Sequence, residues 1–154
     1  MTNTPDTAWW NKNYPSDART RAFVDMAMAQ VEGCQNYLAA TNGIPGVVRV
    51  ACIESFWVNV RLLVEFLVKL PNDPRNANAR TLVPDWQKPT GGLADRLLKD
   101  WLTASANVMH FDKKERAPKD LADVTPMSDE DYQRIARDVR TVYEQFCKAA
   151  DAHH

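Results

Sequence analysis

The 154-residue sequence predicts an all-α protein, built as a four-to-five-helix up-and-down bundle. Apolar residues recur at helical spacing in four separate stretches, and no stretch alternates polar and apolar residues as a strand does. The five glycines are also too few for a sheet rich in turns. Because the length suits one domain, we expect an irregular arm over residues 1–15 and a single helical domain over residues 16–150.

The first predicted helix runs from the capping residues Ser16 and Asp17 to about Ala40, where Asn42-Gly43 can form its C-terminal turn. Six small or apolar residues share one face, which we expect to face the core: Phe23, Met26, Ala27, Val31, Cys34 and Leu38.

The second predicted helix spans residues 47–70, opened by Pro45-Gly46 and ended by Pro71 and Pro74. It is apolar on most sides, so we expect it at the centre of the bundle. A long proline-rich connection follows over residues 71–91, with Leu82, Val83 and Trp86 predicted to anchor it to the surface.

The third predicted helix spans residues 93–112 and the fourth follows the capping box formed by Ser128 and Asp131. The apolar residues of the third helix include Leu97, Leu98, Trp101 and Leu102. The fourth carries apolar residues at a regular three-four spacing: Tyr132, Ile135, Val139, Val142 and Phe146.

Charged residues interrupt the apolar second helix along one side. Glu54, Arg61 and Glu65 fall on a single stripe at about 100° per residue. Buried charge is costly unless it is paired and hydrogen-bonded, so this line of charges requires a partner surface.

The third helix offers that partner, because Asn107 and His110 share one of its faces and Arg116 follows it. A carboxylate beside a histidine fixes its tautomer and raises its basicity. We therefore regard His110, Arg61 and Glu65 as candidate catalytic residues, and Glu54, Asn107 and Arg116 as candidate binding residues. The simpler interpretation is that the charges fix helix register and that His110 is hydrogen-bonded scaffold.

Composition argues against several function classes. The net charge is -1, so no overall field favours nucleic acid or an anionic membrane. On the fourth helix, Arg134, Arg137 and Arg140 are interleaved with acidic residues, which predicts a solvated face. The sequence has no Glu-x-x-His or His-Glu-x-x-His pattern and no glycine-rich phosphate loop, so we expect neither a metal nor a cofactor.

The three cysteines are far apart in the sequence and odd in number, which indicates small apolar core residues in a reducing, cytoplasmic setting. Residues 47–70 are long enough to span a bilayer, but each of their charges would cost roughly 2.5–3.5 kcal/mol near its centre. We therefore expect no membrane association.

Two segments carry a family resemblance. Residues 53–67, IESFWVNVRLLVEFL, and residues 105–111, SANVMHF, with Arg116 beyond, resemble an uncharacterised bacterial helical family similar to HEPN-type domains. The resemblance implies a helical bundle that is often homodimeric and occurs in toxins and RNA-processing enzymes.

Active HEPN ribonucleases place an arginine a short spacer before the motif histidine. His110 resembles that histidine, but the arginine positions hold Thr103, Ala104 and Ser105. The resemblance therefore implies a non-catalytic binding module, a homodimer with a possible RNA or protein partner. The alternative is a metal-independent RNA-cleaving or nucleotide-acting enzyme that uses His110 with Arg61 or Arg116.

Overall fold

The computed structural model describes residues 16–40, 43–73, 76–107 and 127–153, and in these ranges the protein is all-helical, with five α-helices and no strand. The long helices are α2 (Ser16–Ala40), α3 (Gly46–Val64), α5 (Gly91–Asn107) and α6 (Asp129–Ala152), and α4 (Ala79–Leu82) is a single turn. The predicted helical class is confirmed, whereas the predicted arm over residues 1–15 lies outside the described ranges.

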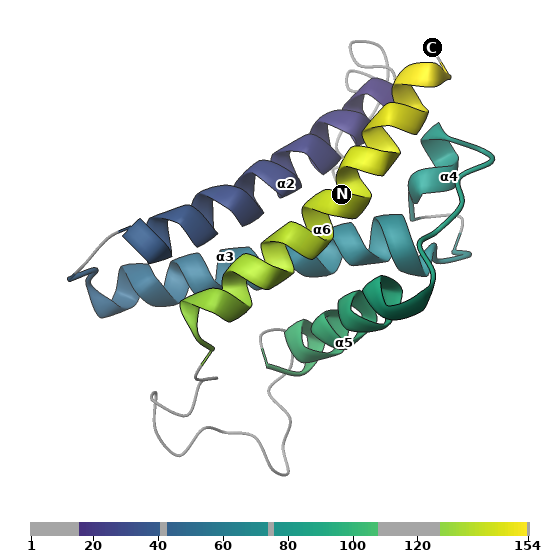
Figure 1. Cartoon of the computed structure of the whole chain (residues 1–154). Coiled ribbons are helices and arrows are strands. Elements are labelled where there is room, and N and C mark those ends of the chain that lie inside the picture. Colours follow the sequence, from purple (N-terminus) through teal and green to yellow (C-terminus); the bar gives the residue numbers. More distant parts are fainter. Residues whose placement is uncertain (1–15, 41–42, 74–75, 108–126, 154) are drawn as a thin grey trace, which may run out of the picture.

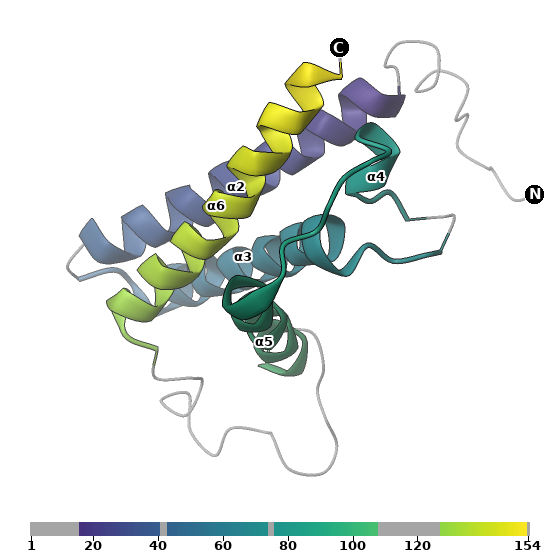
Figure 2. The same cartoon turned by 45° about the vertical axis from the view of Figure 1, so that its right-hand side comes forward.

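The α2 and α3 helices form an antiparallel pair, and α6 lies across both of them (Figure 1). The α5 helix packs against the other side of α3, as the turned view makes clear (Figure 2). The predicted central place of the second helix is therefore confirmed, because α3 contacts α2, α5 and α6.

The α3 helix continues without a break into a π-helix, η1 (Glu65–Lys69). The N–H of Leu70 donates to the carbonyl oxygen of Glu65 at 3.1 Å, which closes the wide turn. Leu70 then adopts a left-handed conformation with φ of 51°, and Pro71 prevents the helix from continuing. A single wide turn of this kind often marks a functional position.

The core gathers around α3. Phe56 and Val60 are fully buried, and Phe56 meets the Tyr132 ring of α6 edge-on, with ring centroids 5.0 Å apart. The α6 helix buries the predicted three-four series, and its capping box at Ser128 and Asp131 is formed as predicted. This edge-to-face contact is one of the packing contacts that hold α6 on α3.

The predicted core face of α2 is wrong at two positions. Phe23 is 54% exposed and Met26 is 51% exposed, whereas their neighbours Val24 and Met28 are buried. The buried side is rotated because α2 must contact α6 as well as α3, which turns Phe23 and Met26 out of the core. The Leu98 and Leu102 side chains of α5 are exposed for the corresponding reason, since α5 contacts the bundle mainly through α3.

The connection after η1 is held down as predicted by buried Val83 and Trp86. The indole N–H of Trp86 donates to the carbonyl oxygen of Leu67 at 2.9 Å, which fixes the connection to η1. Within this stretch α4 is a short helix that the sequence analysis did not anticipate. The predicted third helix corresponds to α5, and its predicted residues 108–112 lie outside the described ranges.

Candidate functional site

A polar cluster joins the end of α3 to α5. The indole N–H of Trp101 on α5 donates to Glu65 Oε1 at 3.1 Å, and Arg61 Nε lies 3.4 Å from the same oxygen. We call Arg61, Glu65, Lys69 and Trp101 the Trp101 cluster. The cluster lies where η1 begins, because Glu65 is both the first residue of the wide turn and the acceptor of the indole hydrogen bond.

Both cations of the Trp101 cluster lie against the indole ring. Lys69 Nζ is 3.1 Å from the ring centroid, and Arg61 Cζ is 5.8 Å from it. Cations in these positions are attracted by the ring quadrupole. The ring of Trp101 is therefore engaged by Lys69 and Arg61 within the chain itself.

The sequence-predicted residues are only partly brought together. Arg61 and Glu65 face the predicted third helix, α5, where the group they meet in the described part of the chain is Trp101. They also pair with each other, which the sequence analysis did not predict. Glu54 is exposed to solvent, so its predicted place in a buried line is wrong. The cause is that α5 covers only the later turns of α3.

The remaining candidates stay predictions. Asn107 is the last residue of α5, and its side chain lies outside what the structure describes. His110 and Arg116 belong to residues 108–126, which also lie outside the described ranges. The predicted contact of His110 with the acid–base line is therefore neither confirmed nor contradicted.

The sequence analysis missed an ion-pair network between α5 and α6. Arg134 donates two hydrogen bonds to Asp100, at 2.9 and 3.0 Å, and Arg96 donates two to Asp138, at 2.8 and 3.0 Å. The Arg134 guanidinium also lies 3.3 Å from Asp138, which links the two pairs. Asp100 is only 6% exposed, so the network reaches into the bundle.

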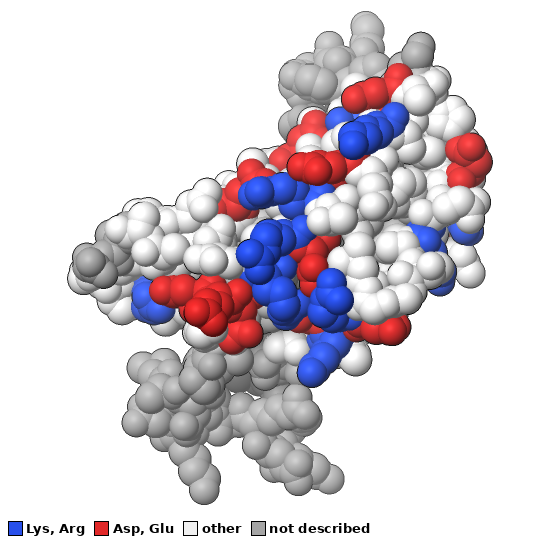
Figure 3. Space-filling view, in the orientation of Figure 1, with Lys and Arg blue, Asp and Glu red and all other residues white. Residues whose placement is uncertain are grey.

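The predicted solvated arginine face of α6 carries ion pairs that the sequence analysis did not anticipate: Arg134 and Arg140 are partly exposed and also pair with residues of neighbouring helices. Arg140 pairs with Glu32 of α2 at 2.6 Å, and Figure 3 shows the charged side chains interleaved along α6. The hydrogen bonds from Arg96 hold the pKa of Asp138 below its ordinary value of 3.8. Of the interleaved acidic residues, Asp138 pairs with Arg134 on the same helix, whereas Asp100 of α5 and Glu32 of α2 supply partners from other helices. The sequence could not show these last two pairs because the partners are far apart along the chain.

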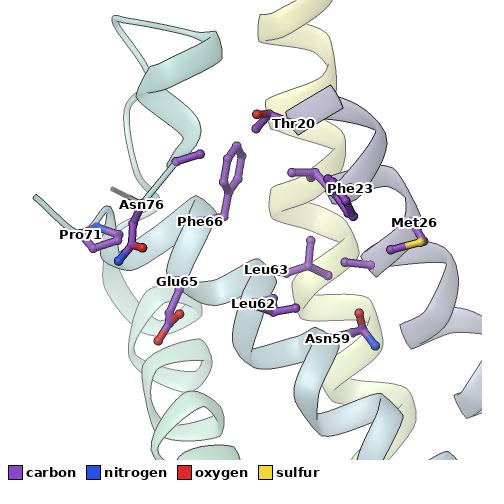
Figure 4. A pocket seen from close by; sticks show the side chains of 13 residues that line it. Thr20, Phe23, Met26, Asn59, Leu62, Leu63, Glu65, Phe66, Pro71 and Asn76 are labelled. Carbon is purple, nitrogen blue, oxygen red and sulfur yellow. The ribbon is translucent and has the colours of Figure 1, made fainter. Parts of the chain in front are cut away.

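A hollow of about 410 Å³ opens between α2 and the end of α3. Figure 4 shows Phe23 and Met26 of α2 opposite Leu62 and Phe66, with Glu65 at the edge of the hollow. Leu62 is 51% exposed, like Phe23 and Met26. We call this space the first hollow. Its walls are mainly apolar and can take an apolar group, with one carboxylate at the margin.

A second hollow, of about 390 Å³, lies at the other end of the same helix pair. Its walls are entirely uncharged: Gln30, Cys34, Val47, Val48, Ala51, Cys52 and Ser55. Val47 is 78% exposed. Met26 of the first hollow is one turn from Gln30, and Asn59 of the first donates to the Ser55 carbonyl oxygen at 2.7 Å.

The two hollows therefore follow one another along α2 and α3, and we call them together the α2–α3 groove. Among the residues that line the groove, only Glu65 is charged. The ion pairs of the described residues are concentrated instead where α6 meets α2 and α5. A large, uncharged surface with exposed apolar side chains is typical of an interaction site.

Scans of protein-family models and searches of curated proteins and solved structures found no match to this chain. In the described ranges no helix has both the length and the apolar character to cross a membrane. The same ranges contain no group of three or more metal-binding side chains.

Proposed function

We propose that the protein is a HEPN-like, non-catalytic interaction module of the cytoplasm that forms a homodimer through the α2–α3 groove. The observation that carries the proposal is the uncharged lining of that groove, interrupted only by Glu65 at one end. Apolar side chains that are half exposed in the single chain would lose their contact with water in the complex. The Trp101 cluster would then mainly fix how α5 is seated on α3.

A second copy suits this surface because the groove has a neutral polar middle and apolar ends. Gln30, Ser55 and Asn59 lie where the two hollows meet. A two-fold axis at that point would set each of these side chains near its own counterpart, where neutral amides and hydroxyls can hydrogen-bond reciprocally. Identical charged side chains would repel one another there, so the absence of charge favours self-association over a charged partner.

The same axis would match the two ends of the groove. Leu62 and Val48 are fourteen residues apart on α3, which corresponds to about 21 Å along the helix. The two-fold would bring the exposed Phe23 and Leu62 of one copy toward the second hollow of the other. Each hollow would thereby receive apolar side chains from its partner, and α2 and α3 of both copies would form a four-helix layer.

The molecular mass in solution tests the proposal. We expect sedimentation velocity to show a dimer for the wild-type chain and monomers for Leu62→Asp and Val48→Asp, because each variant buries two unpaired carboxylates in the interface. Leu102→Asp is the matched control, since Leu102 is 60% exposed but lies on α5 outside the groove. Circular dichroism establishes that each variant is folded.

A wild-type chain that stays monomeric across the accessible concentration range would overturn the proposed homodimer. Dimers that persist in both folded groove variants, or that are lost equally in Leu102→Asp, would show that the interface lies elsewhere. A monomer that gains mass only with added RNA would instead favour a nucleic-acid partner.

The enzymatic alternative is less well supported by the described residues. It assigns Arg61 to phosphate charge, yet Arg61 is paired with Glu65 and packed on the Trp101 ring. An RNA-cleaving role for His110 therefore rests on the family resemblance.

A further inference from the structure

Two cysteines that are distant in the sequence lie together on facing helices. Cys34 of α2 and Cys52 of α3 both line the second hollow, and both are partly exposed. The third cysteine, Cys147, belongs to α6 and lies on a different surface beside Tyr143. The chain therefore contains one thiol pair and one separate thiol, which serves as an internal reference.

The paired thiols are close enough to interact. Burial, and next the neighbouring Cys34 thiol, raise the pKa of Cys52. At neutral pH Cys52 is therefore mainly protonated and unreactive as a nucleophile. Any reaction of the pair is expected to be slow near neutrality and faster in mildly alkaline buffer.

We propose that Cys34 and Cys52 form a reversible redox modification site, which glutathione disulfide or a disulfide of the same class converts to a disulfide linking α2 and α3. One cysteine thiolate attacks a sulfur of glutathione disulfide, which breaks the S–S bond and releases one glutathione thiolate. The other cysteine thiolate then displaces the second glutathione. Two protein thiols are oxidised, one glutathione disulfide is reduced, and the two protons end on the released glutathiones.

The geometry of the hollow supports this pairing. The two cysteines line the same hollow from neighbouring helices that pack together. Disulfide formation requires their Cα atoms to come within about 4.4–6.8 Å and their Cβ atoms within about 3.5–4.5 Å, with the Cβ atoms directed toward each other. The hollow gives the oxidant access from solvent in a single chain. The site does not depend on the proposed homodimer, although a second copy in the groove would cover it.

Counting free thiols after incubation with glutathione disulfide in mildly alkaline buffer tests the inference. The experiment uses the wild-type chain and the Leu62→Asp chain. The Leu62→Asp chain is expected to be a monomer, so no second copy covers its groove. We expect the count to fall from three to one, with the Cys34–Cys52 link identified by mass spectrometry of the unreduced digest. A reducing agent should restore all three thiols.

Serine variants distinguish the pair from the single thiol. In the same background, Cys147→Ser should lose both remaining thiols to the intramolecular link, whereas Cys34→Ser and Cys52→Ser should form none. Glutathione adducts without a Cys34–Cys52 link in the folded Leu62→Asp chain would overturn the inference. If the Cys34–Cys52 disulfide forms in the Leu62→Asp chain but not in the wild-type dimer, both proposals are supported. If the wild-type chain is a monomer and forms the disulfide to the same extent, the redox site is supported and the homodimer is refuted.

Discussion

Trp101 donates its indole hydrogen bond to Glu65 at the residue where α3 becomes a π-helix. The contact joins α5 to the central helix, and Lys69 at the other end of the wide turn lies against the same ring. One indole therefore meets both ends of η1. This relationship gives the charged stripe of the central helix a structural purpose that does not require catalysis.

Trp101→Phe should lower the free energy of unfolding by about 0.5–1.5 kcal/mol, because it removes one hydrogen bond to the partly exposed Glu65 carboxylate while keeping an aromatic ring. Trp86→Phe is the matched variant, and it should cost more because it leaves the buried Leu67 carbonyl without its indole donor. Urea unfolding measures both. An equal or larger loss for Trp101→Phe would mean that the Trp101 cluster contributes more than this contact.

Arg134→Met should destabilise the protein by about 1–2 kcal/mol, because it leaves the buried Asp100 carboxylate without its two hydrogen bonds. The loss is smaller than for a fully buried pair because Arg134 is partly exposed. Arg137→Met on the exposed side of α6 should change stability by less than about 0.5 kcal/mol. Similar thermal unfolding of the two variants would contradict the role assigned to the network.

Acid should weaken the α5–α6 contact through Asp138. Its folded-state pKa lies below the ordinary 3.8, so its contribution to stability is present above that value and is lost as the pH falls through the folded-state pKa. The stability difference between the wild-type chain and Asp138→Asn should therefore shrink from about pH 4 downward. Urea unfolding at several pH values measures it, and a difference that stays constant in acid would refute the assignment.

The alternative enzymatic function is tested by incubating the purified protein with mixed RNA beside a His110→Ala control. On the interaction-module proposal we expect no cleavage by either chain. Cleavage that disappears specifically in His110→Ala, in a folded protein without added metal, would establish the ribonuclease interpretation and displace the non-catalytic one.

The helical class and the main helices could be predicted because hydrophobic periodicity and helix-capping residues are local properties of the sequence. Ser128 with Asp131 gives the start of α6, and Pro71 marks where η1 must end. The exposure of Phe23 could not be predicted, because it depends on where α6 lies relative to α2. Spacing on one helix shows which residues share a side, but it does not show how far a neighbour covers that side.

The candidate site was predictable to the same extent. The stripe that holds Arg61 and Glu65 could be predicted from their spacing, and it does face another helix. Its connection to Trp101 was not found, although an indole N–H that needs an acceptor was a usable signal in the sequence. The Asp100–Arg134 pair and the proximity of Cys34 to Cys52 are long-range contacts between different helices. They require the packing arrangement itself, which no spacing in the sequence specifies.

The wide turn of η1 changes how the chain tolerates length. It holds one more residue than an α-helical turn, so the side chains after it are rotated by about 100° relative to an uninterrupted helix. Removing Leu67 would restore ordinary winding, yet it would swing Lys69 away from the indole of Trp101 and delete the residue whose carbonyl oxygen accepts the hydrogen bond from Trp86. In this protein a shorter and more regular helix would therefore be the defective one.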